Sequence, residues 1–323
     1  MTGEVKQVLV IQAGGIAEFV LSLAAMKRIR LAHPRARVTL LTVPQFEGLA
    51  KASPYFNTVW TTARPTTPGD WMALRGQIKR GRFDRVYDLE SSGWSKFLFH
   101  LLRPFPPVWS GAAVGARLRH RNPRRDEMHT LERQAEQLQA AGIWPDAPTA
   151  PGDAPAPDLS WILRRAPDAR PVPGAAAPRP FVLMVPGGVE NTPEKRWPVE
   201  AYGRLGAVLR ARGYDIVVIG GPHESALART IQKLAGNARD LTGRTDFAQI
   251  AVLGVRAALA IGNNTGPMHL IAAAGAPTIT LVRDDGDAMV TAPRGHVAVL
   301  QAPSLVDLSV ETVATAANAL LPR

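Results

Sequence analysis

Short apolar runs alternate with helix-patterned segments along the first half of the chain. Residues 7–12, 37–43 and 82–89 have the length and composition of buried strands, whereas residues 18–34 and 71–79 place apolar side chains at helical spacing. Strands and helices that alternate in this way form right-handed βαβ units around a mainly parallel sheet. The pattern therefore predicts an α/β fold.

A Pro-rich segment interrupts this rhythm before it starts again. A helix pattern at residues 124–143 has Gly142 as its stop signal, and from residue 145 to 180 prolines are too frequent for a helix or a central strand. We predict an N-terminal domain at residues 1–160, a linker at 161–180 and a C-terminal domain at 181–323. Two Rossmann-like domains of this kind would face a cleft, and ligands of such sheets bind at the carboxyl ends of the strands.

The charge of the chain limits its partners. The 38 Lys and Arg exceed the 27 Asp and Glu, which gives a formal net charge of +11. A basic chain favours nucleic acid, an anionic membrane surface or phosphorylated substrates, although basicity also arises from compositional drift in a chain rich in Ala, Arg and Pro. Aromatic residues do not interleave with the basic ones and no helix-turn-helix pattern is present, which argues against nucleic acid.

The chain has no cysteine, which excludes disulfides, thiolate metal ligands and cysteine nucleophiles. No apolar run reaches the roughly 20 residues that span a bilayer. The first residues lead directly into a strand pattern, without the features of a signal peptide. We therefore expect a cytoplasmic protein that is at most peripheral to the inner membrane.

The loop after the first predicted strand carries two glycines and a carboxylate. Gly14 and Gly15 allow the backbone to approach a ligand, and Glu18 lies at the start of the following helix pattern. The G-x-G-x-x-G spacing is absent, and no acidic residue ends the second strand at the position that binds a ribose in dinucleotide enzymes. A hydride-transferring dehydrogenase is therefore disfavoured.

A second loop, at residues 185–198, combines glycines with polar and basic side chains. Gly188 loosens the turn, Thr192 supplies a short hydroxyl group, and Lys195 offers a point charge that suits a phosphate. The alternative is that the Lys-Arg pair is solvated and lies beside the packing aromatic ring of Trp197.

Two further loops begin helices with polar residues. Glu224 can accept two hydrogen bonds from a ribose diol, but as an N-terminal helix residue it also needs no ligand. In the last loop, Asn264 or Thr265 is a candidate N-cap, Gly266 opens the helix and His269 lies one turn further on. Such a helix start can bind an anion through its unpaired amides, or it can be a buried crossover with a well-made cap.

These motifs together resemble one family. The order PGG, KRWP, VVIGGPHE, LTGRT and NNTGPMHLIAAAGAPTITL, preceded by VLVIQAGG near the start, is similar to glycosyltransferase family 9, which includes the lipopolysaccharide ADP-heptose heptosyltransferases. The resemblance is strongest over residues 181–281. It is weaker over residues 8–43 and around FDRVYDLESS.

The resemblance implies a GT-B type enzyme of two Rossmann-like domains, with the nucleotide sugar held mainly by the second domain and the acceptor by the first. Lys195 would pair with the donor diphosphate and Glu224 would hold the adenosine ribose. Thr265, Gly266 and His269 would surround the pyrophosphate and the sugar. The remaining residues expected at the donor are Gly14, Gly15, Gly188, Thr192 and Asn264.

Two departures from the family bear on the chemistry. The family usually has Asp where this chain has Glu18, and that residue is the expected general base of an inverting transfer. It also has an acidic residue where this chain has Asn264, which cannot carry charge. We predict a metal-independent transfer of a sugar, heptose by the resemblance, from an ADP-sugar to a lipopolysaccharide-core or related glycan. A donor-shifted or non-catalytic relative that binds a sugar nucleotide or glycan is the alternative.

Three other features are open at this point. The Asp-x-Asp within residues 284–287 could bind a metal but is expected to be a solvated turn, so no metal or resident cofactor is predicted. The basic run at residues 117–125 offers Arg121, Arg124 and Arg125 to a lipid-linked glycan acceptor or to membrane headgroups, unless it is a solvated loop. Trp71, Trp94 and Trp109 are expected in the core rather than as sugar platforms.

Overall fold

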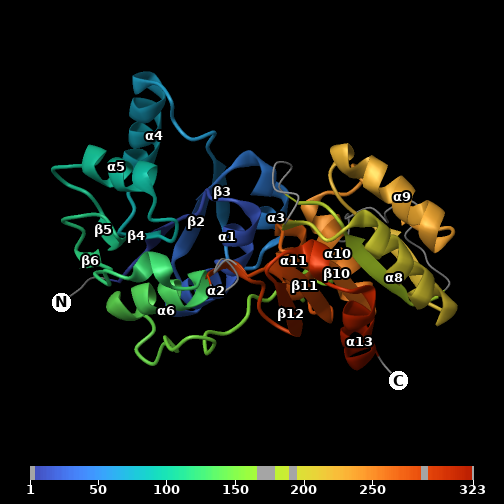
Figure 1. The fold of residues 1–323 in the computed structure, drawn as a ribbon. Helices are drawn as coiled ribbons and strands as arrows, with labels where there is room; N and C mark the ends of the chain where they lie inside the picture. The colour runs from blue at the N-terminus through green and yellow to red at the C-terminus, as the bar shows by residue number, and fades with distance from the viewer. Residues whose placement is uncertain (1–3, 166–178, 189–194, 285–289, 322–323) are drawn as a thin grey trace. The chain divides into compact units, whose positions relative to one another are not determined.

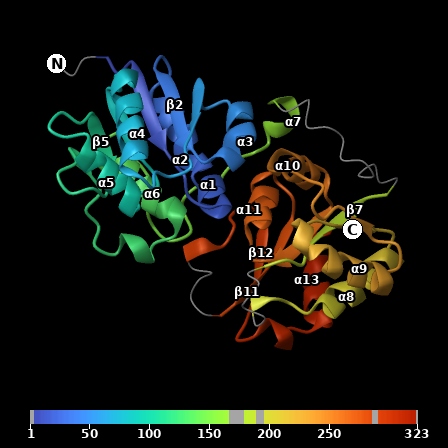
Figure 2. The same ribbon diagram turned by 90° about the horizontal axis from the view of Figure 1, so that it is seen from above.

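The computed structural model describes residues 4–165, 179–188, 195–284 and 290–321. The chain divides into two compact units, Met1–Pro157 and Asp158–Arg323. Each unit has one six-stranded sheet in which all paired strands are parallel, and helices cover the sheets (Figures 1 and 2). The predicted α/β fold is confirmed.

The sheet of the first unit has the order β3-β2-β1-β4-β5-β6. Its strands are β1 (Gln7–Ile11), β2 (Arg37–Thr42), β3 (Thr58–Thr61), β4 (Arg85–Asp88), β5 (Val108–Gly111) and β6 (Leu118–Arg119). Its helices are α1 (Ile16–Leu21), α2 (Leu23–Ala32), α3 (Glu47–Ala52), α4 (Pro68–Gly81), α5 (Gly93–Leu101) and α6 (Thr130–Ala140), with short 3₁₀ turns η1 (Pro44–Phe46) and η2 (Arg125–Glu127).

The predicted helix at residues 18–34 is divided into α1 and α2 at Ser22. The Ser22 hydroxyl donates to the Glu18 carbonyl oxygen at 2.6 Å and accepts from the side-chain amides of Gln12 and Gln134 at 2.6 and 2.7 Å. A serine that bonds back to the preceding turn bends a helix. The apolar spacing predicted the helix but not this break, because the partners of Ser22 come from distant parts of the chain.

Of the three tryptophans predicted in the core of the first unit, one is completely buried and two lie at its border. Trp109 is completely buried between the sheet and helices α4 and α5, whereas Trp71 and Trp94 are half-buried at the border of the same cluster. Helix α6 packs on α1 and α2. It begins at Thr130, later than the pattern suggested, because residues 125–127 form η2 first.

The sheet of the second unit has the order β12-β11-β10-β7-β8-β9. Its strands are β7 (Phe181–Val185), β8 (Asp215–Val218), β9 (Arg239–Asp240), β10 (Leu259–Asn263), β11 (Thr278–Arg283) and β12 (Val297–Ala302). Its helices are α7 (Ile162–Arg165), α8 (Val199–Ala211), α9 (Ser225–Ala235), α10 (Phe247–Arg256), α11 (Gly266–Ala273) and α13 (Val310–Leu320), with 3₁₀ turns η4 (Pro222–Glu224) and η5 (Leu305–Asp307).

Helices of the second unit form two groups. Helix α8 packs against α9 and α13, and α10 packs against α11 and α7. A fully buried cluster that includes Trp197, Tyr202 and Ile261 joins α8 to the sheet. The strand, turn, helix and strand predicted from residues 260–281 are confirmed as β10, α11 and β11.

The described parts of the Pro-rich segment belong to the two units. Gly142 has a left-handed φ of +74° and ends α6, and the Gly152 amide donates to Glu132 at 2.9 Å within the first unit. The Leu159 amide donates to the Ala273 carbonyl oxygen at 2.8 Å within the second unit. Residues 166–178 of the predicted linker lie outside the described residues, so the linker boundaries remain a prediction.

The two sheets share one topology. In each, the first and fourth strands of the unit are neighbours, β1 with β4 and β7 with β10, and the chain order reverses between them. Ligands of open α/β sheets bind at this switch point, beyond the carboxyl ends of the strands. The loops that follow these four strands are therefore where a site is expected in each unit.

Candidate functional site

The first unit has a pocket of about 280 Å³ beyond the carboxyl ends of β1 and β4. It is lined by Gln12, Gly14, Gly15, Glu18, Arg64, Leu89, Glu90, Ser92 and Arg133. Three of these, Gly14, Gly15 and Glu18, are predicted site residues. The pocket lies at the switch point, where the topology predicts a ligand.

Glu18 lies in the first turn of α1 and its side chain is exposed. Its carboxylate lies against Gly15, because a Cβ atom placed on Gly15 would be 2.7 Å from Glu18 Oε2. Within the described residues, the side chains of Gln12 and Ser22 donate to the main-chain carbonyl of Glu18, and no group donates to its carboxylate. The carboxylate lines the pocket without a protein donor in the described chain, which leaves its oxygens available to a substrate hydroxyl.

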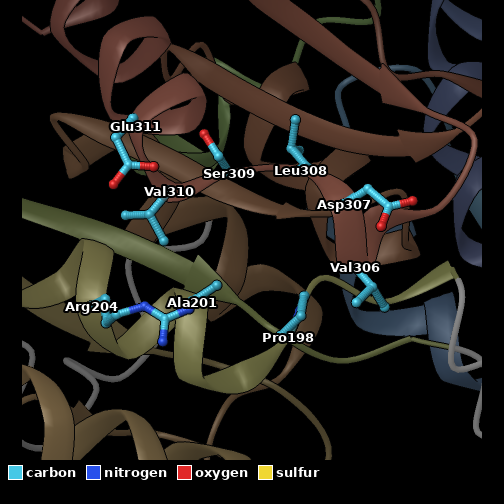
Figure 3. Close-up of a pocket in the computed structure, with 9 residues that line it drawn as sticks. All are labelled: Pro198, Ala201, Arg204, Val306, Asp307, Leu308, Ser309, Val310 and Glu311. Atoms are coloured by element: carbon cyan, nitrogen blue, oxygen red, sulfur yellow. The ribbon is translucent and has the colours of Figure 1, made fainter.

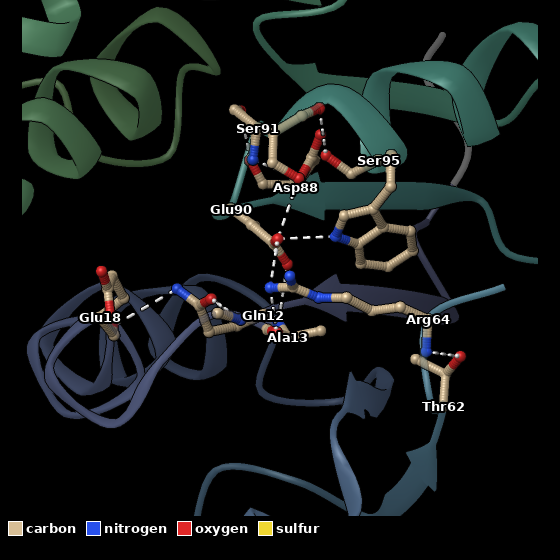
Figure 4. A network of polar contacts seen from close by, with 12 residues as sticks. Gln12, Ala13, Glu18, Thr62, Arg64, Asp88, Glu90, Ser91 and Ser95 are labelled. Atoms are coloured by element: carbon tan, nitrogen blue, oxygen red, sulfur yellow. Dashed lines mark hydrogen bonds and ion pairs between the residues drawn. The ribbon is translucent and has the colours of Figure 1, made fainter. Parts of the chain in front are cut away.

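A second carboxylate in this pocket, Glu90, was not predicted as a site residue. It accepts from the Ala13 amide at 2.9 Å, the Ser92 hydroxyl at 2.9 Å, the Trp94 indole at 2.6 Å and the Arg64 guanidinium at 3.1 Å (Figure 4). Its side chain is 8% exposed. Four protein donors already bind this carboxylate, so it is built into the pocket wall and is a weaker candidate for the base than Glu18.

Two arginines balance the charge of the pocket. Arg64, with a left-handed φ of +60°, reaches the Ala13 carbonyl oxygen at 2.7 Å as well as Glu90 (Figure 4). Arg133 comes from α6, where burial and the nearby charge of Arg125 lower its pKa, and the charge of Glu18 acts in the opposite direction. Neither arginine was predicted, because both reach the pocket from segments far from β1 in the sequence.

Asp88 is completely buried at the end of β4, next to the pocket. Burial raises its pKa to about 7, although the Ser91 amide donates to Oδ1 at 2.8 Å and favours the charged form. Gly111 makes room for this side chain, since a Cβ atom there would be 3.0 Å from the Asp88 Cβ. Asp88 therefore holds a proton under conditions where an ordinary carboxyl group has lost it.

The predicted acceptor residues lie on the connection between β6 and α6. Arg121 and Arg124 are exposed, whereas the Arg125 side chain is 11% exposed and pairs with Asp126 at 2.7 Å. Arg125 is close enough to influence the pKa of Arg133, which lines the pocket. The basic run thus extends to the pocket through Arg125 and Arg133, and its contact with an acceptor remains a prediction.

In the second unit, Glu224 brings two strand-end loops together. A Cβ atom on Gly187 or on Gly220 would collide with its carboxylate, so both glycines are needed where they are. Glu224 Oε2 also accepts from the Gly221 amide at 2.6 Å. The carboxylate lies between the loop after β7 and the loop after β8, and through the Gly221 amide it also caps the 3₁₀ turn η4.

Asn263, at the end of β10, binds the loop after β7 from the other side. Its amide donates to the carbonyl oxygens of Pro186 and Gly187 at 2.9 and 3.0 Å. Its carbonyl oxygen accepts from the Trp197 amide at 3.0 Å and the Tyr202 hydroxyl at 3.2 Å. This buried residue, which was not predicted, fixes both ends of the loop that carries Lys195.

Helix α11 begins at Gly266 with Thr265 as its N-cap, and the Thr265 side chain makes no capping hydrogen bond. Asn264 Oδ1 and Thr265 Oγ1 are buried atoms that have no hydrogen-bond partner among the described residues. Buried polar atoms are usually paired, so two such atoms at a helix start favour a polar ligand there. His269 is 2% exposed in the same helix.

Of the other residues predicted in the loop after β7, the structure describes Gly188 and Lys195. Gly188 accepts from Arg196 at 2.6 Å through its carbonyl oxygen, and Lys195 is half-buried two residues before Trp197. Thr192 lies outside the described residues, as do residues 285–287 of the Asp-x-Asp segment. Within the described ranges, no group of three or more His, Asp or Glu side chains is arranged to hold a metal ion.

The second unit has a pocket that is lined by none of the predicted site residues. It has a volume of about 430 Å³ and lies between the start of α8 and the segment from η5 to α13 (Figure 3). Pro198, Arg204, Val306 and Glu311 are among its lining residues. It is not at the switch point, so we assign the candidate site to the loops described above.

Comparison with solved structures shows the class of fold. A glycosyl transferase family 9 protein from Veillonella parvula is 19% identical with a TM-score of 0.81, and the match covers 99% of this chain and 98% of that one. ADP-heptose LPS heptosyltransferase II of E. coli is 22% identical with a TM-score of 0.78, covering 97% and 98%. E. coli heptosyltransferase WaaC with ADP is 18% identical with a TM-score of 0.79, covering 97% and 99%. The fold is that of GT-B glycosyltransferases.

The chain belongs to glycosyltransferase family 9 (heptosyltransferase), whose sequence pattern matches residues 71–297. Lipopolysaccharide heptosyltransferase 2 of Salmonella typhimurium is 32% identical over 108 residues, or 32% of this chain and 31% of that protein. Lipooligosaccharide heptosyltransferase 2 of Haemophilus influenzae is 31% identical over 108 residues, with 32% and 31% covered. The match thus spans about a third of the length of these curated relatives. Among the described residues, no helix combines the length and the apolar character needed to cross a bilayer.

Proposed function

We propose that the protein is an inverting glycosyltransferase that moves a heptose-type sugar from an ADP-sugar to a lipopolysaccharide-core or related lipid-linked glycan. Family membership supports the reaction type. One structural neighbour is an ADP-heptose heptosyltransferase and another was solved with ADP, which supports the donor. We place the reaction at the cytoplasmic face of the inner membrane, where such an acceptor would be available.

The observation that carries the proposal is the convergence of three strand-end loops in the second unit. Glu224 contacts Gly187 and Gly220, and Asn263 holds the loop before Lys195. In this arrangement Glu224 would accept from the ribose hydroxyls, and Lys195 would pair with the diphosphate. The amides at Gly266 would add fixed hydrogen-bond donors for the leaving group, which are most effective when they are in place before the reaction.

Glu18 supplies the base in this proposal. The acceptor hydroxyl oxygen would attack the anomeric carbon while its proton passes to the Glu18 carboxylate, and the bond from that carbon to the diphosphate oxygen would break. The nucleoside diphosphate would leave with the bonding electrons, stabilised by Lys195 and the helix amides. These groups stabilise the negative charge directly, so the proposed reaction needs no metal ion.

A second candidate is a relative that binds a sugar nucleotide or glycan with a changed donor or without turnover. The observation that favours it is Asn264, whose side chain is neutral where the family has an acid and whose Oδ1 has no partner in the described chain. Glu18 is one methylene longer than the family's Asp. Both differences fall on groups that would contact reacting or donor atoms.

Calorimetric titration with ADP, UDP and GDP, first without and then with magnesium, tests the proposal. Metal-independent preference for ADP, followed by turnover of ADP-heptose with a heptose-deficient lipopolysaccharide, is the expected result. Preference for UDP or GDP would refute the assignment of an ADP-sugar as the donor. Binding of ADP without turnover would favour the second candidate, and no binding of any of the three would refute the proposed transfer and favour a degenerate relative.

A further inference from the structure

Two exposed phenylalanines of the first unit, Phe97 on α5 and Phe105 shortly after it, come from a basic stretch of the chain. Phe97 is 51% exposed and Phe105 is 90% exposed, and they are the only exposed phenylalanines in the described part of the chain. Met72 and Val114 are also exposed, at 54% and 61%. Single exposed apolar residues are common, so their meaning depends on whether they lie together.

Helices α4 and α5, which carry Met72 and Phe97, contact each other. The rings of Trp71 and Phe97 meet edge to face at 4.7 Å between centroids, and Arg75 Nε donates to the Leu101 carbonyl oxygen at 2.9 Å. Helices α4 and α5 lie side by side in both views (Figures 1 and 2). Arg103, just after α5, contacts Gly115 so closely that a Cβ atom there would collide with it, which places Val114 nearby.

The charge of this region is strongly positive. Residues 67–83 and 93–107 contain six Lys or Arg and a single acidic residue, Asp70. The basic residues are Arg75, Lys79, Arg80, Arg82, Lys96 and Arg103. No ion pair neutralises any of these six within the described residues. Exposed aromatic rings with unpaired cations around them suit the interface of an anionic bilayer, where the rings enter the headgroup region and the cations meet phosphates.

We propose that this α4–α5 face, made of Met72, Phe97, Phe105, Val114 and the six basic residues, docks the protein on an anionic phospholipid membrane. The face also lies next to the pocket, because the Trp94 indole donates to Glu90 and Phe97 is less than one helical turn further along α5. A docked protein would therefore have the Glu18 pocket close to the lipid surface. This inference deepens the membrane contact of the proposed function and assigns it to a different surface from the basic run at residues 117–125.

Vesicle co-sedimentation of the full chain tests this face without any sugar donor. We expect binding to vesicles of phosphatidylcholine mixed with phosphatidylglycerol, weakened by salt, and little binding to phosphatidylcholine alone. Lys79→Gln with Arg80→Gln should weaken binding roughly fivefold for each charge, or about thirtyfold for the pair. Arg229→Gln with Lys233→Gln, an exposed pair on α9, is the matched control and should bind like the wild type.

The apolar part of the face has its own variants. Phe97→Ser with Phe105→Ser should weaken binding about tenfold or more, because the two rings would no longer enter the interface. Val208→Ser with Val306→Ser, which removes two exposed apolar side chains of the second unit, is the control and should leave binding unchanged. Thermal unfolding and calorimetric ADP binding confirm that each variant is folded.

Three results would overturn the inference. The first is that the wild-type protein does not bind the anionic vesicles. The second is that the α4–α5 variants bind as well as their controls. A wild-type dimer that becomes monomeric in Phe97→Ser with Phe105→Ser would assign the face to a second copy of the chain instead. An inactive protein that still docks through this face refutes only the proposed function, and an active protein that does not dock refutes only the inference.

Discussion

Replacement of Asn263 by Asp should destabilise the second unit strongly, although the two side chains have almost the same shape. The Asn263 amide donates to the carbonyl oxygens of Pro186 and Gly187, and a carboxylate cannot donate. Each buried carbonyl that loses its donor costs about 1–3 kcal/mol, and burial of the new charge adds to this. We expect the free energy of unfolding to fall by about 3–5 kcal/mol at neutral pH.

The same substitution at the neighbouring residue is the matched control. Among the described residues, the Asn264 amide donates to the Thr291 hydroxyl alone, at 3.1 Å, and Asn264 is half-buried. Asn264→Asp removes this single bond and places its charge at the start of α11, which offsets part of the cost of burying Oδ1, so the free energy of unfolding should fall by only about 1 kcal/mol. Urea denaturation followed by circular dichroism measures both variants, and hydrogen exchange of peptides from β7 and β10 assigns the loss to the second unit.

The destabilisation should also depend on pH. Burial raises the pKa of the introduced carboxyl group in the folded protein above its value in the unfolded chain. The folded state then holds a proton that the unfolded state has lost, so the stability of Asn263→Asp should fall as pH rises and recover in acid. If the free energy of unfolding of Asn263→Asp stays within about 1 kcal/mol of the wild-type value at every pH, Asn263 does not hold the loop after β7 that carries Lys195.

Three other results are expected. Glu18→Ala should lower the transfer rate by about 10²–10⁴-fold and leave ADP binding unchanged in calorimetry, whereas Lys195→Ala should weaken ADP binding; an unchanged rate would reject Glu18 as the base. Burial raises the pKa of Asp88 to about 7, so the wild type loses stability as the pH rises from about 4 to 7. Asp88→Asn has no such carboxyl group, and its free energy of unfolding should rise relative to the wild type over this window. The gain, measured by urea denaturation, should be about 4 kcal/mol at most. Gly187→Ala should displace the carboxylate that lies against it and weaken ADP binding about tenfold, whereas Gly48→Ala, where a Cβ atom meets nothing within 4 Å, should bind ADP normally.

The sequence predicted those parts of the fold that depend on local patterns. Residues 260–281 have a strand run, a capped helix start and a second strand, and each is present within one or two residues of its predicted bounds. The break at Ser22 could not be predicted, because it depends on Gln12 and Gln134, and Gln134 is more than a hundred residues away. Helical spacing describes one segment at a time and contains no information on such partners.

The candidate site was predicted unevenly for the same reason. Glu18, Glu224 and Thr265 follow strands within their own loops, and the rule that ligands bind at strand ends was enough to select them. Glu90 also follows a strand, β4, and the same rule could have selected it. Arg133 comes from the face of a helix, so only the three-dimensional structure places it in the pocket.

The two switch points explain why one chain can carry both halves of the proposed reaction. The sheets have the same topology, but the first unit presents carboxylates beyond β1 and β4, whereas the second presents Lys195 and helix amides beyond β7 and β10. Removing a proton from an acceptor needs an anionic base, and releasing a diphosphate needs cationic and N–H groups. A single pocket with both sets would let Glu18 pair with Lys195, which would neutralise each of them. The carboxylates belong to the first unit and Lys195 to the second, so each unit supplies one half of the groups that the proposed chemistry needs.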